Sequence, residues 1–454
     1  MQQNSASAPI SLSPLNLIRP MLNCRNFIGQ LDDLLIKSKG RVGVLMLDLD
    51  RFRLVSGIAG HDVGEFLLGK VGERLVLNNP ADCIWANYWG DKFFLAVPFI
   101  NDDVKINTII QNIVSTCSRP WIVDNLEFFL SIGIGIAMYP THGISAVELM
   151  KNADLALAEA KARGSNTYQF YKASFLSKVT ENFKIEEALR RTLYSNGEEF
   201  ILNYQPRINL LTGEIDSFEA LIRWNSKELG ALMPDQFIPI AEASGLIVQL
   251  DEWVLINACR QIQQWKSRGY NIRISVNLSA NQLYDEHLLT LIIRTLAFFQ
   301  INSDQLELEI TETMIMLNLE LAVATLGKLK DIGVQIAMDD FGTGYSSLTN
   351  LKELPIDILK IDKSFIQDME KSNKNKALVQ AIITLGHILD MKVTAEGVEN
   401  HSQLALLRQH ACDEVQGFYF SRPILPEHAY NMLVHGNVEA RKLKNALALD
   451  SSLL

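Results

Sequence analysis

The stretch Gln335-Ile336-Ala337-Met338-Asp339-Asp340-Phe341-Gly342 decides how the second half of this chain is expected to fold. It begins as a short apolar run with the length of a buried strand, and the run ends in two adjacent carboxylates. Neighbouring side chains of a strand point in different directions, so Asp339 and Asp340 can serve different partners. The stretch therefore predicts a strand that carries reactive groups at its end.

Short β-rich runs of this kind recur through the second half, and helical or loop sequence follows most of them. They cover residues 202–204, 217–222, 272–277, 306–310, 335–339, 358–361, 392–395 and 414–418. Eight such strands predict an α/β fold of the TIM type, a (β/α)8 barrel. Residues 207–216, between the first two runs, are too few for a helical crossover. We therefore expect these two strands to form a hairpin, which gives the barrel one antiparallel strand.

Polar side chains gather at the ends of these runs, where barrels of this type place their active sites. The set comprises Glu219, Asn277, Glu309, Glu312, Asp339, Asp340, Lys360, Asp362, Glu396, Glu399 and Gln416. So many carboxylates would repel one another without a cation, and oxygen ligands suit Mg²⁺ or Mn²⁺ better than zinc. Two ions that share Asp339 would suit phosphoryl transfer. Surface salt bridges could explain any one residue but explain the whole set poorly. For Glu312 and Asp362, hydrogen-bonded support of the fold is an equally good explanation.

Composition narrows the class of protein. The length of 454 residues suggests two or three domains, and the net charge of −10, without a dense Lys/Arg block, argues against a nucleic-acid polymer as partner. No apolar run reaches 18 residues, and the first nine residues lack the pattern of a signal peptide, so we expect a cytoplasmic protein without a membrane span. The five cysteines are scattered, which argues against zinc ligation and a disulfide framework.

The first half alternates strands and helices and predicts one compact α/β domain. We expect strands at 42–49, 84–88, 93–97 and 128–137, and helices at 63–77, 104–117 and 146–163. A charged segment, 178–193, has apolar residues near helical spacing and predicts a connecting helix, either a spacer or a lever. The expected organisation is a tail (1–21), a first domain (22–175), the connecting helix (176–196), the barrel (197–440) and a second tail (441–454).

The motifs of the second half, taken in order, resemble an EAL domain over residues 202–433. They are Tyr204-Gln205-Pro206, Glu219-Ala220-Leu221-Ile222-Arg223-Trp224, Val276-Asn277-Leu278-Ser279, Glu309-Ile310-Thr311-Glu312, Asp339-Asp340-Phe341-Gly342-Thr343-Gly344, Leu359-Lys360-Ile361-Asp362, Ala395-Glu396-Gly397-Val398-Glu399 and Gln416-Gly417. Each motif alone is weak, but their number, order and spacing make the resemblance specific. It implies a bacterial phosphodiesterase that hydrolyses cyclic di-GMP to linear pGpG.

The resemblance also implies roles for individual residues. Two ions of Mg²⁺ or Mn²⁺ per active site would be held by Glu219, Asn277, Glu309, Asp339, Asp340 and Glu396. Lys360 would orient the attacking water, and the catalytic set would comprise Lys360, Glu219 and Glu396. The dinucleotide would contact Gln205, Arg223, Asp362 and Gln416, with the guanidinium of Arg223 matching phosphate oxygens. Glu312, Gly342 and Gly344 would belong to a loop that couples dimerisation to the metal site, which implies a homodimer.

The first half resembles a GGDEF domain, a nucleotidyl-cyclase-like α/β domain, over residues 22–171. The resemblance is carried by Leu47-Asp48-Leu49-Asp50-Arg51-Phe52, Gly60-His61-Asp62-Val63-Gly64-Glu65, Ser131-Ile132-Gly133 and Asn152-Ala153-Asp154. The signature itself is broken: where the family has Gly-Gly-Asp-Glu-Phe, this chain has Trp89-Gly90-Asp91-Lys92-Phe93. Trp89 places a ring where glycine admits the nucleotide, and Lys92 replaces a metal-binding carboxylate with a cation. The resemblance therefore implies an inactive cyclase.

Several alternatives stay open at this stage. The first domain is a weak GTP-binding regulator, a dimerisation module or a folding partner, and we favour dimerisation or allosteric support. For the second domain, the rival to the enzyme is a non-catalytic cyclic di-GMP receptor. Such receptors usually lose metal ligands, and this sequence retains them. A bifunctional cyclase-phosphodiesterase is a further rival, and Lys92 argues against it.

Overall fold

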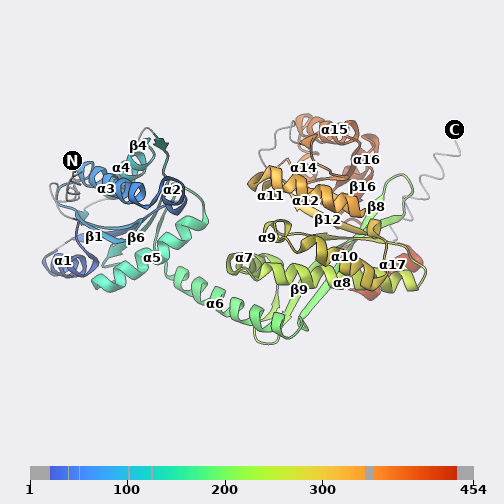
Figure 1. The fold of residues 1–454 in the computed structure, drawn as a ribbon, viewed down its shortest axis with the longest axis horizontal. Helices are drawn as coiled ribbons and strands as arrows, with labels where there is room; N and C mark the ends of the chain where they lie inside the picture. Colours follow the sequence, from blue (N-terminus) through green and yellow to red (C-terminus); the bar gives the residue numbers. More distant parts are fainter. Residues whose placement is uncertain are drawn as a thin grey trace, which may run out of the picture. The chain divides into compact units, whose positions relative to one another are not determined.

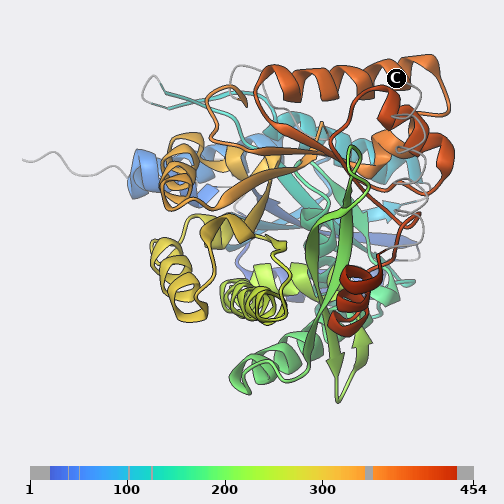
Figure 2. The same cartoon turned by 90° about the vertical axis from the view of Figure 1, so that its right-hand side faces the viewer.

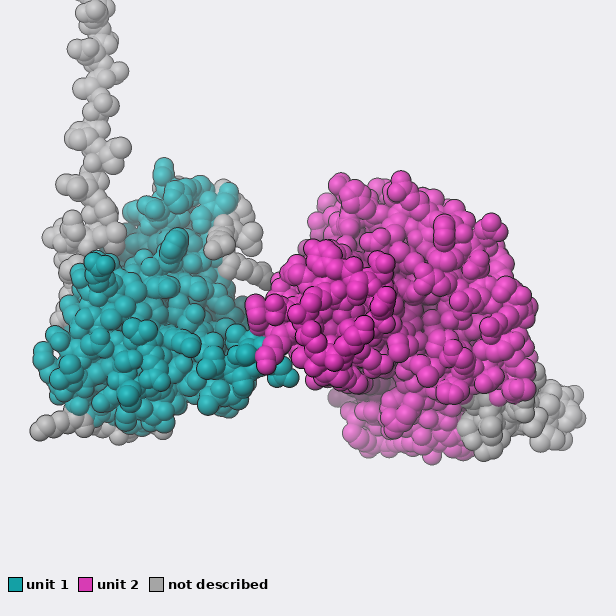
Figure 3. Space-filling model, turned by 90° about the horizontal axis from the view of Figure 1, so that it is seen from below, with its two compact units in different colours: residues 1–181 teal, residues 182–454 magenta. Residues whose placement is uncertain are grey.

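A computed structural model describes residues 21–436, except 39, 51, 101–102, 124–125 and 343–350. The expected C-terminal tail, residues 1–20 of the N-terminal tail and the loop position Gly344 lie outside the described residues. The chain forms two compact units, one up to Glu181 and one from Asn182 onward (Figure 3). In the described part of the chain, no helix combines the length and the hydropathy needed to cross a bilayer.

The first unit is built on a five-stranded sheet with strand order β2-β3-β1-β6-β7. The strands are β1 (Arg41–Leu49), β2 (Ile84–Trp89), β3 (Lys92–Ile100), β6 (Ile132–Tyr139) and β7 (Tyr168–Phe170). The central strand β1 is antiparallel to both of its neighbours, β3 and β6. Its side chains alternate between two hydrophobic clusters, because successive residues of a strand face opposite sides of the sheet.

Helices cover both faces of this sheet (Figure 1). The cluster on one face contains Leu45 and Leu47 of β1 with residues of α3 (His61–Leu77) and α4 (Asp103–Cys117). The cluster on the other face contains Val44 and Met46 with residues of α1 (Cys24–Lys37) and α5 (Ala146–Ala162). A short helix, α2 (Phe52–Ala59), follows β1. The first half is thus one α/β unit, as its strand and helix pattern predicts.

The expected strand 128–137 is wrong in one respect, because it is two strands. β5 (Leu126–Phe128) pairs with β4 (Trp121–Val123) in a separate hairpin, and β6 begins only at Ile132. Between them Ser131 is held by Asp50, whose amide donates to the Ser131 carbonyl at 2.9 Å and whose Oδ2 accepts from the Ser131 hydroxyl at 2.7 Å. The chain changes pairing partner there, so one continuous apolar run serves two sheets.

The second unit is the predicted barrel. Its strands are β8 (Phe200–Asn209), β9 (Ile215–Ser226), β11 (Arg273–Asn277), β12 (Leu306–Thr311), β13 (Gln335–Phe341), β14 (Ile358–Ile361), β15 (Lys392–Ala395) and β16 (Glu414–Gln416). The ring closes because β8 pairs with both β16 and β9. Both of these pairings are antiparallel and all others in the ring are parallel, which confirms the prediction of a barrel with one antiparallel strand. A short strand outside the ring, β10 (Gly230–Leu232), pairs antiparallel with the end of β9.

Helices surround this barrel, and α17 lies against β8 (Figure 2). The helices are α7 (Pro234–Ser244), α8 (Ile247–Ser267), α9 (Ala280–Leu283), α10 (Leu288–Phe299), α11 (Glu312–Leu317), α12 (Leu319–Ile332), α14 (Lys363–Asp368), α15 (Asn373–Ile388), α16 (His401–Gln409) and α17 (Pro426–His435), with a 3₁₀ turn at Ser303–Gln305. The segment expected to form the connecting helix lies in α6 (Ala173–Tyr194), which has residues in both units. Its later turns bury Ile185 and Leu189 against Phe200 and Trp224.

The barrel interior is polar, whereas barrels of this type are usually filled by branched apolar side chains. The residues that are fully buried and polar include Arg207, Ser275, Glu307, Thr394 and Glu414. Arg207 on β8 bonds to Glu307 on β12, although β8 and β12 are not neighbours in the ring. The contact therefore crosses the interior. Burying these groups is tolerable only because they are paired.

One prediction concerns the close approach of β6 to α5 in the first unit. A Cβ atom added to Gly135 would collide with the backbone of Ala153 and Leu157. Gly135→Ala should therefore lower the free energy of unfolding of this unit by at least about 1–3 kcal/mol, as overpacking does. The control is Gly69→Ala in α3, where a Cβ meets nothing within 4 Å and a gain of about 0.5–1 kcal/mol is expected. Thermal denaturation followed by circular dichroism compares the two, and equal melting temperatures would contradict the close approach.

Candidate active site

The site lies at the ends of the barrel strands and is centred on the ammonium group of Lys360. Lys360, on β14, is buried, with 1% of its side chain exposed. Its Nζ lies 2.5 Å from Oε2 of Glu309, 2.6 Å from Oε1 of Glu396 and 3.0 Å from Oδ1 of Asp339. Burial alone would lower the pKa of Lys360, but these carboxylates outweigh it and hold the pKa well above its ordinary value. A permanent cation thus links β12, β13 and β15 to β14.

A second group of bonds is centred on Glu219 of β9. Its Oε1 accepts from Nδ2 of Asn277 at 3.0 Å, and its Oε2 accepts from Nε2 of Gln416 at 2.6 Å. The same Gln416 nitrogen lies 3.0 Å from Oε1 of Gln205, whose own Nε2 donates to the Ser421 carbonyl at 3.0 Å. Three predicted ligand or substrate residues are therefore joined to Glu219 in one chain of hydrogen bonds.

The two adjacent aspartates stand at an irregularity of β13, where the pairing with β14 shifts between Met338 and Phe341. Asp340 has a positive φ of 53°, and its amide donates to Oδ1 of Asp339 at 2.9 Å. A non-glycine residue in this region of backbone space is uncommon and marks a constrained position. Burial, and then the nearby carboxylates Asp339 and Asp362, raise the pKa of Asp340.

The remaining predicted residues are less closely joined to this centre. Oε2 of Glu312 accepts from the amide of Gly342 at 3.4 Å, which connects the start of α11 to the glycine-bearing loop. Asp362 caps α14 by accepting from the amide of Ser364 at 3.0 Å. Arg223 donates from Nη1 to the carbonyl of Ile222 at 2.8 Å, and burial lowers its pKa. The side chain of Asp362 is thus already used to cap α14.

The charges of the site bear on whether it suits a metal. Burial, and then repulsion from Glu309, raise the pKa of Glu219, and burial raises the pKa of Glu396 to about 8 against the attraction of Lys360. Burial also opposes ionisation of Glu309, but Lys360 and Arg207 outweigh it and lower its pKa to about 2. Burial is the main cause of the raised values, and repulsion from neighbouring carboxylates adds to it.

The donor set fits a hard divalent ion. The six side chains expected to bind metal all offer oxygen, which Mg²⁺ and Mn²⁺ prefer. Within the described ranges, no three His, Cys, Asp or Glu side chains form a group that could hold a metal ion as they stand. Glu309, Asp339 and Glu396 instead share the ammonium of Lys360. The residues thus match the ion in chemistry, and Lys360 supplies the positive charge among them.

Arg207 was not among the expected site residues, because it was expected to lie in the connection between the first two strands. The structure places Arg207 inside β8, which continues to Asn209. Its guanidinium is fully buried and bonds to Glu309 and Gln416, both of the predicted set. The available signal was the two-residue period, since Gln205 and Arg207 fall on the same face of the strand.

The broken signature of the first unit forms the hairpin between β2 and β3. Trp89 is 82% exposed, and Gly90 turns the chain with a φ of 52°. The Asp91 carbonyl accepts from the amide of Leu49, and Phe93 is buried in the core. Nζ of Lys92 lies 3.8 Å from Asp48 and 4.0 Å from Asp154. Lys161 adds a second ammonium 2.6 Å from Asp48. The buried carboxylate of Asp48 is therefore neutralised by side chains of the unit itself.

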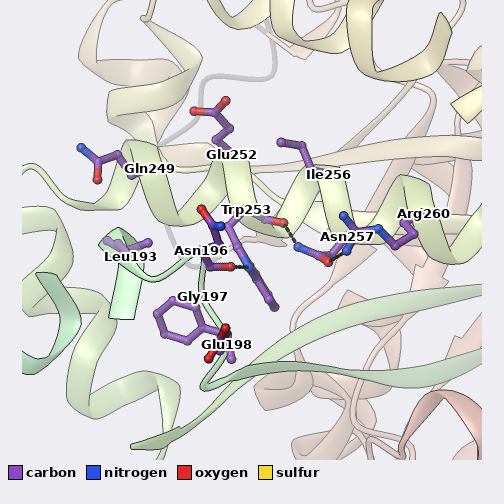
Figure 4. A pocket seen from close by; sticks show the side chains of 11 residues that line it. Leu193, Asn196, Gly197, Glu198, Gln249, Glu252, Trp253, Ile256, Asn257 and Arg260 are labelled. Atoms are coloured by element: carbon purple, nitrogen blue, oxygen red, sulfur yellow. Dashed lines mark hydrogen bonds between the residues drawn. The ribbon is translucent and has the colours of Figure 1, made fainter. Parts of the chain in front are cut away.

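A separate hollow of about 600 Å³ lies between the residues that follow α6 and the helix α8 (Figure 4). Nε1 of Trp253 donates to the Asn196 carbonyl at 3.0 Å, and Nδ2 of Asn257 donates to the Trp253 carbonyl at 2.7 Å. Arg260 in turn donates to Asn257 at 2.5 Å. These polar groups bond to one another, and none of the lining residues belongs to the set around Lys360.

Models of protein families match both halves of the chain. The model described as "EAL domain" matches residues 186–423, and the model described as "Diguanylate cyclase, GGDEF domain" matches residues 21–167.

Curated relatives and solved structures agree with these matches. "Cyclic di-GMP phosphodiesterase NbdA" of Pseudomonas aeruginosa is 38% identical over 88% of this chain and 50% of its own length. "Bifunctional diguanylate cyclase/cyclic di-GMP phosphodiesterase MucR" of the same organism is 38% identical over 86% of this chain and 57% of its own length. The chain thus spans about half the length of the curated relatives it matches.

Among solved structures, "PaMucR Phosphodiesterase, c-di-GMP complex" is 39% identical with a TM-score of 0.52, covering 54% of this chain and 99% of that one. "Structure of EAL Enzyme Bd1971 - cGMP bound form" is 26% identical with a TM-score of 0.54, covering 68% of this chain and 84% of that one.

The central ammonium group generates a prediction about stability. Lys360→Met would leave Glu309, Asp339 and Glu396 without their shared cation. Without divalent ions, the free energy of unfolding of the second unit should fall by about 3–5 kcal/mol, the usual loss when one partner of a buried ion pair is removed. Chemical denaturation in the presence of a chelator measures the change.

The matched control is Lys371→Met, which removes the exposed partner of Asp368 and should cost less than about 0.5 kcal/mol. If Lys360→Met were as stable as this control, the ammonium would not be needed to balance the buried carboxylates.

Proposed function

Since the chain belongs to the EAL domain family and carries a GGDEF domain ahead of its EAL domain, we propose that its second unit hydrolyses cyclic di-GMP to linear pGpG. The observation that supports this most is the set of oxygen-bearing side chains at the strand ends near Lys360, namely Glu219 on β9, Asn277 on β11, Glu309 on β12, Asp339 and Asp340 on β13, and Glu396 directly after β15. Names of relatives point the same way, because two of them are called cyclic di-GMP phosphodiesterases.

In the proposed reaction, a water oxygen attacks one phosphorus atom of the cyclic dinucleotide and the bond from that phosphorus to the 3′ oxygen breaks. The water loses a proton and the released 3′ oxygen gains one, which leaves a 5′ phosphate and a free 3′ hydroxyl. Two divalent ions, when bound, would neutralise charge on the attacking and leaving oxygens. We assign their coordination to Glu219, Asn277, Glu309, Asp339, Asp340 and Glu396.

The other residues of the site would bind and orient the substrate. Lys360 holds three carboxylates in place and offers a permanent positive charge near the attacked phosphate. Gln205 and Gln416 form an amide pair at the mouth of the barrel, suited to hydrogen bonding with the dinucleotide. Arg223 has a guanidinium that matches two phosphate oxygens at once. Asp362 is a weaker candidate for substrate contact, because its side chain already caps α14.

We assign the first unit a regulatory or dimerisation role without cyclase activity. Lys92 occupies the space beside Asp48 and Asp154 where a cyclase of this family would bind a cation, and like charges repel. Trp89 adds an exposed ring at the hairpin. The whole chain would therefore remove cyclic di-GMP and not make it.

The first test is direct hydrolysis. Purified protein incubated with cyclic di-GMP and Mn²⁺ should release pGpG, which chromatography separates from the substrate. Asp339→Asn should lower the rate by about 100-fold or more, because it weakens a ligand shared by both ions. Asp368→Asn, at an exposed helix position, is the control and should leave the rate unchanged. Tight binding of cyclic di-GMP without any product would instead support the receptor alternative.

The second test addresses the first unit. The full chain with GTP and Mg²⁺ should give no cyclic di-GMP, since the Lys92 ammonium stands where the metal would bind. To keep the product from being lost, the measurement uses the Asp339→Asn background, in which hydrolysis is blocked. Accumulation of cyclic di-GMP there would overturn the assignment of an inactive cyclase.

A further inference from the structure

One buried guanidinium group, that of Arg207, holds four side chains in the barrel interior. Its Nε donates to Oε1 of Gln416 at 2.9 Å, and its Nη1 donates to Oε1 of Glu307 at 2.5 Å. Its Nη2 donates to the hydroxyl of Ser275 at 2.9 Å and also pairs with Oε1 of Glu309. These partners come from β16, β12 and β11, so Arg207 on β8 joins four strands of the ring.

Two of these partners belong to the site around Lys360, and Arg207 fixes the orientation of each. Glu309 gives Oε1 to Arg207 and Oε2 to Lys360, so both of its oxygens have defined directions. The guanidinium has donors only, so the oxygen of the Gln416 amide must face it. The amide nitrogen of Gln416 is then directed at Glu219, 2.6 Å away, and at Gln205, 3.0 Å away.

A further partner of Arg207, Glu307, connects it to a second group of charged side chains. Glu307 is fully buried and also pairs through Oε2 with Nε of Arg273 at 3.0 Å. Arg273 in turn bonds to Asp216 at 3.0 Å and to Glu414 at 3.2 Å. Through Glu307, Arg207 is therefore tied to a group of polar side chains that includes no predicted metal ligand. A planar fork with this many fixed partners cannot be reproduced by an ammonium group.

We propose that Arg207 is a positioning residue for the reaction proposed above, on which this inference rests. It fixes Glu309 directly and Glu219 through Gln416, so that the two carboxylates keep the geometry that divalent ions require. Groups that orient metal ligands typically alter metal affinity or activity by about 10–100-fold when they are replaced. The alternative is a purely structural role, in which Arg207 only neutralises buried Glu307 and Glu309.

The test compares two arginines that share the partner Glu307. Arg207→Lys keeps the positive charge but loses the planar guanidinium group with its several donors. The dissociation constant for Mn²⁺, measured by calorimetry, should therefore rise about 10–100-fold. The kcat for cyclic di-GMP at saturating Mn²⁺ should fall, because the ligands that orient the substrate also shift. Arg273→Lys is the control, since Arg273 contacts Glu307 but neither Glu309 nor Gln416, and it should leave Mn²⁺ affinity and kcat unchanged.

The outcomes separate this inference from the proposed function. If the wild type binds Mn²⁺ and releases pGpG while Arg207→Lys matches Arg273→Lys in both measurements, Arg207 has only a structural role and the inference is wrong. If the wild type neither binds Mn²⁺ nor releases pGpG, the proposed function itself falls, and the inference falls with it. If Arg207→Lys fails to fold, Glu307→Gln is measured in its place. This change weakens one bond of Arg207, and Glu307 contacts none of the predicted site residues in the described part of the chain. Weaker Mn²⁺ binding than in Arg273→Lys then supports the inference, and equal binding overturns it.

Discussion

The need to neutralise carboxylates inside a closed barrel governs the second unit of this protein. Glu219, Glu307, Glu309 and Glu414 are all buried, and an isolated carboxylate in such a place is very costly. Arg207, Arg273 and Lys360 repay part of that cost by contacting several carboxylates each. These contacts do not offset the whole cost of burial, which still raises the pKa of Glu396 to about 8 and that of Glu414 to about 7. Within this interior the buried carboxylates Glu219, Glu307, Glu309 and Glu414 outnumber the cations Arg207, Arg273 and Lys360 beside them.

The arrangement follows from a simple feature of strands. Successive side chains of β12 alternate between apolar residues, which pack against the surrounding helices, and Glu307 and Glu309, which face the interior. Because the parallel strands end at the same rim, polar residues near the strand ends meet there, and those nearer the strand starts form a second network around Arg273. Arg207 joins the two networks because β8 runs antiparallel to its neighbours and contributes a long side chain from the opposite direction.

Much of this architecture could be predicted from the sequence. The eight short runs, the brief connection between the first two and the polar residues at their ends predicted the barrel, its antiparallel strand and the set of residues that gathers around Lys360 and Glu219. The two-residue period could have placed Arg207 on the same face as Gln205, but it could not reveal the role of Arg207, which depends on partners about 70 to 210 positions away. The break between β5 and β6 was missed for a related reason: local apolar content does not reveal that the chain changes its pairing partner at Ser131.

In the first unit, the charge of a buried carboxylate is balanced by lysines of the same unit. Its buried carboxylate, Asp48, is paired with Lys161 at 2.6 Å and lies 3.8 Å from Lys92, so two ammonium groups of the chain stand beside one acid. Around it the fold is intact: β1 is buried in the middle of its sheet, and helices cover both faces. Packing of this unit depends on the apolar residues of β1 and β6, whereas Lys92 contributes charge beside Asp48 and no side chain to either hydrophobic cluster. In the second unit the buried acids outnumber the cations beside them, so the two units differ in the balance of charge around their buried carboxylates.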